Sequence, residues 1–260
     1  MIDPLMFIAL LPAVVLVVYI CRKDRTDKEP PALIAKLLGY GVLSCLPAIV
    51  VELILSAIIE RLNVRNAYLG FFLEAFVVAG LTEETCKFLF LRTTWRNPAF
   101  DYQFDAIVYA VMVALGFAAF ENVKYVYSYG FATGIVRAVT AVPGHAIFGV
   151  FMGYFYGYAK LSDYWGRGED RKAYLALSVV VPVLMHGCYD FLAFAQESDS
   201  RFTLLFYAYL VALYVFGIRR VNRSARDDRR VTRETVFDYF RRMQYPMPPQ
   251  YRDRNDDFWR

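Results

Sequence analysis

The sequence predicts an all-α fold, a polytopic bundle of about seven to eight transmembrane helices. Hydrophobic residues make up 58% of the 260-residue chain, whereas apolar residues make up about 45–50% of soluble domains. They gather in seven apolar segments, with most charged residues lying between the segments. A helix needs about 20 apolar residues to cross a hydrocarbon core of about 30 Å. The segments therefore have the length of membrane spans.

The seven segments follow one another closely along the chain. They cover residues 5–20, 32–59, 68–91, 104–127, 135–160, 173–195 and 202–218. The first and the last are at the short end of the range that spans a bilayer. Because the first segment has no basic stretch before it and no small-residue cleavage site after it, we expect a retained span rather than a signal peptide.

The lysines and arginines of the connections indicate the orientation. Alternate connections carry 4, 2, 4 and 12 of these residues on one side of the bilayer, and 2, 0 and 1 on the other. Basic loops stay in the cytoplasm, so we expect an integral membrane protein with its N-terminus outside and its C-terminus in the cytoplasm. This placement accounts for the arginines without a nucleic-acid partner.

The chain divides into two parts of different composition. Residues 1–218 form the predicted helical membrane domain, whose polar motifs lie within about residues 70–195. Residues 219–260 form a predicted Arg-rich cytoplasmic tail, in which four apolar residues recur at helical spacing: Val236, Phe237, Phe240 and Met243. We expect a short amphipathic helix over residues 231–243 that lies on anionic headgroups, with a partner-binding module as the alternative.

Polar side chains inside the spans mark the candidate site. An ionised group in the bilayer core is costly unless it is paired or hydrated, so its presence there indicates a use. The third segment holds Glu83, Glu84 and Lys87, and the next three segments add further polar residues: Glu121, Asn122, His145, His186 and Asp190. At about 1.5 Å of rise per residue, these groups lie from the middle of the bilayer toward its outer half, where they can meet in one pocket.

Helical spacing pairs several of these groups. Lys87 follows Glu83 by four residues and Glu84 by three, so it can reach either carboxylate. Adjacent residues point about 100° apart on a helix. We therefore expect one glutamate to face a cavity and activate water, and the other to pair with Lys87 or cap a neighbouring helix. His186 and Asp190 are also four residues apart, which allows Asp190 to hold one imidazole nitrogen.

Each group also has a purely structural interpretation. Glu83 and Lys87 alone would suit an ion pair, and either histidine alone would suit an interhelical hydrogen bond. Glu52 and Glu74 are expected to be local partners for backbone groups or for Arg137. A small-residue stripe in the fifth segment predicts close helix packing and consists of Gly149, Gly153 and Gly157. The combination of acids and histidines over four consecutive spans nevertheless exceeds what packing requires.

The residues by themselves suit peptide hydrolysis. This reaction needs a base, a partner for the oxyanion and a proton donor for the leaving amine, and glutamates and histidines supply all three. No serine or cysteine lies beside a histidine with a third orienting group, so such a nucleophile is not expected. Zinc held by Glu84, His145 and His186 is the alternative. The chain has no HExxH motif, and we expect a glutamate mechanism without a cofactor.

Four motifs together resemble a known family. They are Glu83-Glu84-Thr-Cys-Lys87, Gly116-Phe-Ala-Ala-Phe-Glu-Asn122, Pro143-Gly-His145 and His186-Gly-Cys-Tyr-Asp190. In this order and at this spacing they closely resemble the PrsW family of intramembrane proteases. That family is similar in turn to the CAAX-prenyl-protease and bacteriocin-processing superfamily. The resemblance covers about residues 70–195.

The resemblance implies a peptidase of a bacterial-type cell membrane. Its implied substrate is a membrane-anchored protein, such as an anti-sigma factor whose site-one cleavage starts a regulated stress-signalling cascade. Carried over, Glu83 or Glu84 would be the base that activates water, with a preference for Glu83. His145 and His186 would orient that water or stabilise the oxyanion. The supporting residues would be Lys87, Glu121, Asn122 and Asp190, although relatives in the wider superfamily have histidine or asparagine in the motif that holds Glu121.

Two other classes of function stay open at the level of sequence. Intramembrane carboxylates and histidines also mark proton-coupled transporters, but the chain has no inverted repeat of broken spans. A non-catalytic scaffold that binds lipid or membrane peptides through residues 219–260 would tolerate loss of the glutamates. A protease would lose cleavage in Glu83→Ala or Glu84→Ala and still insert into the membrane.

Overall fold

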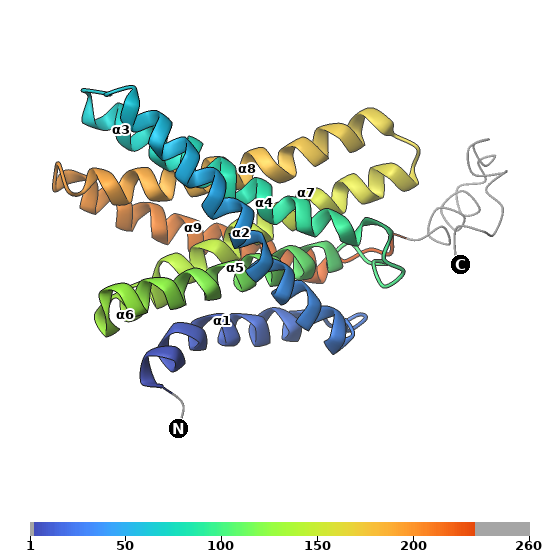
Figure 1. Cartoon of the computed structure of the whole chain (residues 1–260). Helices are drawn as coiled ribbons and strands as arrows, with labels where there is room; N and C mark the ends of the chain where they lie inside the picture. Colours follow the sequence, from blue (N-terminus) through green and yellow to red (C-terminus); the bar gives the residue numbers. More distant parts are fainter. Residues whose placement is uncertain (1–2, 232–260) are drawn as a thin grey trace, which may run out of the picture.

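The computed structural model describes residues 3–231, which contain helices and no strand (Figure 1). The elements are α1 (Pro4–Lys23), α2 (Pro31–Arg61), α3 (Ala67–Phe72), η1 (Leu73–Leu81), α4 (Thr82–Leu91), η2 (Arg92–Arg96), α5 (Asp105–Tyr129), α6 (Phe131–Val139), α7 (Ala141–Tyr164), α8 (Gly168–Ala195) and α9 (Arg201–Arg226). By length and composition, six stretches are able to cross a membrane: α1, α2, α5, α6 with α7, α8 and α9. The predicted all-α polytopic bundle is confirmed.

The third predicted span is built from three consecutive helical pieces. α3, η1 and α4 follow one another without a break from Ala67 to Leu91, and η1 is a π-helix. Because each piece alone is too short to cross a membrane, this composite is not among the six stretches above. Counted with this composite, residues 3–231 make seven passes.

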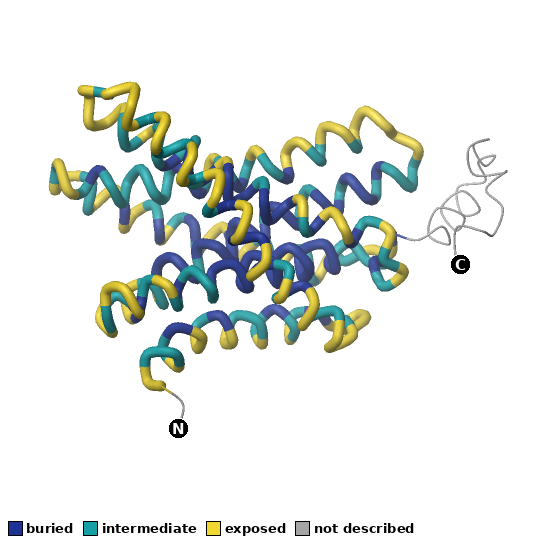
Figure 2. Tube along the Cα trace, viewed as in Figure 1, coloured by how far each residue is buried: buried dark blue, intermediate teal, exposed yellow. Residues whose placement is uncertain are grey.

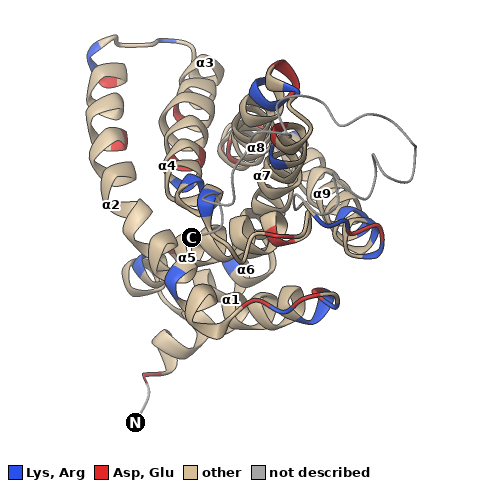
Figure 3. Ribbon diagram, turned by 90° about the vertical axis from the view of Figure 1, so that its right-hand side faces the viewer, with Lys and Arg blue, Asp and Glu red and all other residues tan. Residues whose placement is uncertain are grey.

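The connections lie alternately at the two ends of the bundle. In Figure 1 the α1–α2, η2–α5 and α7–α8 connections lie at the right-hand end, and so does the end of α9. The α2–α3, α5–α6 and α8–α9 turns lie at the left-hand end, as does the beginning of α1. Figure 3 faces the right-hand end, where lysine and arginine gather in the connections around a bundle of mostly uncharged helices.

Helix α5 forms the centre of the bundle. Its residues from Asp105 to Ala118 are all buried, whereas α1 and α2 present many exposed apolar side chains at the periphery (Figure 2). A helix that is apolar on all sides belongs in the core of a large or membrane-embedded protein. The neighbours α1, α2 and α7 all pack against α5.

Glycines bring α7 and α2 into close contact with α5. A Cβ atom at Gly149 would lie 2.9 Å from the Cβ of Ala114, and one at Gly153 would overlap the carbonyl oxygen of Ala106. The predicted close packing by the glycine stripe is therefore confirmed. Gly41 of α2 and Gly116 of α5 meet in the same way, because a side chain on either one would overlap the backbone of the other helix.

The structure differs from the predicted spans at two places. The predicted span 135–160 is divided at Thr140, whose backbone angles (φ −125°, ψ −73°) end α6 before α7 begins. Helix α9 continues to Arg226, beyond residue 218, where the last predicted span ends. The predicted amphipathic helix over residues 231–243 falls outside the described residues, except for its first residue.

Candidate active site

The π-helix η1 leads directly into the two glutamates. Its wider turn is supported by Thr82, whose hydroxyl donates to the carbonyl oxygen of Val77, five residues earlier, at 3.5 Å. Short π-helical turns are frequent at functional sites. Glu83 and Glu84 then lie in the first turn of α4 and are 7% and 0% exposed.

Both glutamates contact Lys87. The Nζ atom of Lys87 lies 3.1 Å from Oε2 of Glu83 and 2.7 Å from Oε1 of Glu84. The expectation that only one carboxylate would pair with the lysine is therefore wrong, because the long lysine side chain lies between the two. The glutamates still differ, since Glu83 lines a cavity and the enclosed Glu84 does not.

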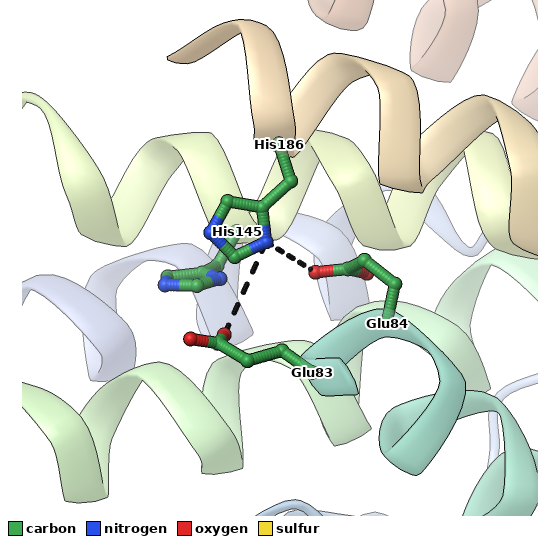
Figure 4. Close-up of side chains that lie close together, drawn as sticks. All are labelled: Glu83, Glu84, His145 and His186. Carbon is green, nitrogen blue, oxygen red and sulfur yellow. Dashed lines mark hydrogen bonds and ion pairs between the residues drawn. The ribbon is translucent and has the colours of Figure 1, made fainter. Parts of the chain in front are cut away.

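Two histidines from different helices complete the cluster (Figure 4). His186 of α8 directs its Nδ1 atom toward the glutamates, 2.9 Å from Oε1 of Glu84 and 4.0 Å from Oε2 of Glu83. His145 of α7 directs its Nδ1 atom to Nζ of Lys87 at 3.1 Å. Both histidines are 4% exposed. The Nδ1 atoms of both histidines therefore point into the same cluster as the two carboxylates.

A second carboxylate holds the other nitrogen of each histidine. Nε2 of His145 lies 3.0 Å from Oε2 of Glu121, and Nε2 of His186 lies 3.2 Å from Oδ2 of Asp190. A carboxylate that accepts a hydrogen bond from Nε2–H fixes the orientation of the ring. This leaves each Nδ1 atom as the nitrogen that can bind a cation within the cluster.

Arg137 of α6 belongs to the site through contacts that the sequence did not predict. Its guanidinium donates to Oδ1 of Asn122 at 3.0 Å and pairs with Oε2 of Glu121 at 2.9 Å. Of the two kinds of partner expected for Glu52 and Glu74, backbone groups or Arg137, the arginine instead contacts α5, because α6 turns it toward that helix. An arginine within an apolar segment indicated that Arg137 has a polar partner. Which partner it contacts depends on how α6 and α7 meet at Thr140.

Asn122 itself does not enter the cluster. Its amide nitrogen donates to the carbonyl oxygen of Ala9 in α1 at 2.8 Å, while its oxygen accepts from Arg137. Asn122 is fully buried. Its contacts join α1, α5 and α6 behind Glu121, so it supports the wall of the site rather than its reacting groups.

A cavity of about 350 Å³ opens beside the cluster. Three residues of the cluster line it, together with the two carboxylates that contact the histidines: Glu83, His145 and His186, with Glu121 and Asp190. Glu52 and Glu74 line another part, where Glu74 accepts a hydrogen bond from Ser56 at 3.2 Å. The ring of Phe148 stacks on His186 with centroids 5.0 Å apart. The reactive groups therefore face a partly polar cavity inside an otherwise apolar bundle.

The cluster has the donor atoms and the charge for a metal ion. One ligand atom from each of Glu83, Glu84, His145 and His186 lies within 4.8 Å of the others. Within the described residues, Oε2 of Glu84 is buried and has no hydrogen-bond partner. Two imidazole nitrogens with carboxylate oxygens are ligands that zinc takes in peptidases, so these residues fit such an ion.

The balance of charges around the cluster is also relevant to cation binding. Glu83, Glu84, Glu121 and Asp190 provide four carboxylates, and within residues 3–231 the permanent cations that contact them are Lys87 and Arg137. If both histidines are neutral, as an imidazole must be to bind a metal ion, two of these negative charges lack a counter-ion among these contacts. A buried charge without a partner is costly, and a divalent cation would balance the deficit.

Comparison with known proteins identifies relatives over most of the chain. Protease PrsW of Bacillus subtilis (strain 168) is 34% identical over 214 residues, which is 82% of this chain and 92% of the relative. Protease PrsW of Oceanobacillus iheyensis is 35% identical over the same shares of both proteins. Protease PrsW of Clostridioides difficile (strain 630) is 28% identical over 87% of this chain and 94% of its own length. No solved structure matches the chain.

The family description corrects the expectation about the cofactor. The family whose model matches residues 29–218 is described as the PrsW family intramembrane metalloprotease. The expected mechanism without a metal is therefore wrong, and the cluster of Glu83, Glu84, His145 and His186 is the corresponding candidate metal site. The absence of an HExxH motif did not exclude a metal site, because the ligand-type residues of this site come from three separate helices. The chain belongs to the PrsW family of intramembrane metalloproteases.

Proposed function

We propose that this membrane-embedded peptidase cleaves a membrane-anchored protein at a metal centre inside its helical bundle. One observation carries the proposal: four buried ligand-type side chains have donor atoms within 4.8 Å of one another. Three of the four also line the cavity of about 350 Å³. Buried ionisable groups in a membrane bundle mark functional sites, since packing alone does not repay their burial.

Glu84, His145 and His186 would hold the ion. Glu84 is fully enclosed and has an oxygen with no hydrogen-bond partner among the described residues, while both histidines aim Nδ1 at the cluster. When bound, a divalent ion such as zinc would activate water and polarise the scissile carbonyl.

Glu83 would be the general base. It is the one glutamate of the pair that lines the cavity, so its carboxylate can reach a water molecule beside a bound peptide. A base must lie within hydrogen-bond reach of the proton that it takes. Glu83 would accept this proton and return it to the leaving amine, while Lys87, 3.1 Å away, holds the carboxylate in place.

Glu121, Asp190 and Arg137 would position the histidines. Glu121 and Asp190 each accept a hydrogen bond from Nε2–H of one imidazole. Arg137 forms an ion pair with Glu121. Such outer contacts fix the direction of a metal-binding histidine. None of these three side chains needs to touch the scissile bond.

The cavity favours cleavage near the outer surface. Its lining includes Ser56 near the end of α2, Glu74 soon after the α2–α3 turn, and Tyr125 near the end of α5. These residues lie toward the end of the bundle that also holds the beginning of α1. The positive-inside rule assigns that end to the outside. A membrane-anchored substrate cut there would undergo site-one cleavage, and an anti-sigma factor is our proposed substrate class.

Cleavage in proteoliposomes tests the proposal. Wild type, Glu83→Gln and Glu84→Gln would be reconstituted with single-span reporter proteins that carry different outer juxtamembrane sequences. We expect both variants to insert normally and to lose at least a hundredfold in cleavage rate, because each amide removes a charge at the reacting centre. Full activity in both variants would reject the proposal. Membrane-protein fragments compared between cells with wild type and with Glu84→Gln would then identify the substrate.

A further inference from the structure

A second polar cavity, of about 230 Å³, lies at the opposite end of the bundle. Its walls come from the start of α5, the second half of α7 and the end of α9 with the residues that follow it. It shares no lining residue with the active-site cavity. Its arginines and tyrosines are Arg220, Arg223, Arg229, Tyr154 and Tyr158.

The charges of this cavity favour an anion. Three arginines line it, and Asp227 is the single acidic residue in its lining. Asp227 lies 3.6 Å from Nε of Arg223, at the outer limit of an ion pair, so it neutralises the arginines only in part. The guanidinium of Arg220 lies 4.0 Å over the ring of Tyr154, which holds this cation against the cavity wall.

The side chains suit a phosphate group in particular. A guanidinium binds phosphate oxygens through two parallel N–H donors, and three arginines line this one cavity. Three further residues with hydroxyl groups belong to the same lining: Tyr154, Tyr158 and Ser224. A carboxylate ligand would use fewer of these donors than a phosphate.

The depth of the cavity matches the lipid headgroups. The last apolar segment of the sequence ends at residue 218, and Arg220 and Arg223 lie within the next two turns of α9. The same end of the bundle carries the basic connections (Figure 3). Basic pockets between membrane helices on the cytoplasmic side bind anionic headgroups. We propose that this cavity binds a phosphate group, presented by an anionic phospholipid such as phosphatidylglycerol.

A bound phosphate would tie three parts of the chain together. Arg229 belongs to the segment after α9, whose backbone pairs with the residues before α5: the N–H of Gln103 donates to Arg229 O at 2.8 Å, and that of Val231 donates to Asp101 O at 2.6 Å. A ligand that contacts Arg220 and Arg229 therefore joins α9 to this segment. The lipid would stabilise the cytoplasmic end, at a distance from the peptidase site and independently of cleavage.

Lipid binding by the full-length protein tests the proposal. The protein would be placed in nanodiscs of phosphatidylcholine with or without phosphatidylglycerol, and bound lipid would be counted by native mass spectrometry after release. We expect one tightly retained phosphatidylglycerol on wild type. The double variant Arg220→Gln/Arg223→Gln should lose at least tenfold in affinity, since one charge-assisted contact corresponds to about a tenfold change in binding.

Two further variants make the test decisive. Arg219→Gln is the matched control, because Arg219 neighbours Arg220 on α9 but does not line the cavity, and it should retain the lipid. Arg229→Gln changes an exposed residue outside the helix and should weaken binding even if the double variant folds poorly. Equal retention in wild type, Arg229→Gln and the double variant would overturn the proposal.

A free-phosphate arm separates the two sources of the ligand. Inorganic phosphate would be titrated in phosphatidylcholine nanodiscs, with thermal unfolding as the readout. We expect no shift of the unfolding midpoint at 10 mM phosphate, whereas phosphatidylglycerol should raise the midpoint by several degrees. A saturable shift with phosphate that is lost in Arg220→Gln/Arg223→Gln, without selective lipid retention, would show that a soluble phosphate is the ligand and would overturn the lipid assignment.

Discussion

Replacing Asp190 by asparagine should weaken metal binding about tenfold and leave the fold intact. Oδ2 of Asp190 lies 3.2 Å from Nε2 of His186, and the side chain is 17% exposed. Asparagine keeps an acceptor oxygen at this place but removes its negative charge. The imidazole would keep its orientation and lose part of the electrostatic support that makes Nδ1 a good ligand.

The magnitude follows from the type of hydrogen bond. A bond to a charged acceptor contributes about 1.5–3 kcal/mol, and a neutral one about 0.5–1.5 kcal/mol. The midpoints of these ranges differ by about 1.3 kcal/mol, close to the 1.4 kcal/mol that corresponds to a factor of about ten in affinity. Glu121→Gln should weaken metal binding more than Asp190→Asn does. Glu121 also pairs with Arg137 at 2.9 Å, and the substitution leaves that arginine without its carboxylate partner.

Metal competition in detergent measures this effect. Wild type and variants would be titrated against a chromophoric zinc chelator of known affinity. Glu74→Gln serves as the control, because Glu74 lines the same cavity and contacts Ser56 rather than a histidine. If Asp190→Asn binds zinc as tightly as wild type, or if Glu74→Gln weakens binding equally, the assigned role of Asp190 is refuted.

Two further predictions concern glycine packing in the helical bundle and the buried carboxylate of Asp24. Gly153→Ala should destabilise the protein by about 1–3 kcal/mol, because the added methyl group overpacks against α5. Gly70→Ala is the control and should have little effect, since Gly70 has open space around it. Thermal unfolding in detergent compares the two variants, and equal unfolding midpoints would contradict the packing argument. Burial, with a smaller contribution from Asp228, raises the pKa of Asp24 to about 6. Because the folded state binds this proton more tightly, the stability it contributes is present near pH 4 and is lost as pH rises through about 6. Asp24→Asn should therefore raise the unfolding midpoint at pH 8 and leave it nearly unchanged at pH 4, and an equal shift at both pH values would exclude Asp24 as the titrating group.

Much of the helical bundle could be predicted because its apolar segments are long and its connections are charged. The division at Thr140 was not predicted, since apolar residues continue on both sides of it. Pro143 in the first turn of α7 was the available signal, because proline is favoured at the start of a helix. The π-helix η1 has no comparable pattern in the sequence. Its close packing against α8, where Gly80 faces the backbone of Val183 and Gly187, depends on tertiary structure.

The candidate site divides in the same way. Contacts within one helix, such as Lys87 with Glu84 or His186 with Asp190, follow from residue spacing. Contacts between helices do not, and the pairing of His145 with Glu121 depends on the glycine-mediated approach of α7 to α5. Spacing allowed Lys87 to reach either glutamate, but its contact with both at once was not predicted, because the two side chains point about 100° apart on the helix.

Metal content and cleavage measured on the same sample test the central claim most directly. Purified protein would be stripped with a chelator, assayed on a membrane-anchored reporter, and then titrated with zinc while bound metal is counted. We predict that cleavage disappears on stripping and returns in proportion to bound zinc, with saturation near one ion per chain, and that Glu84→Gln neither retains the ion nor recovers. Full cleavage by protein that holds less than about a tenth of an ion per chain would contradict a metal-dependent site built on Glu83, Glu84, His145 and His186.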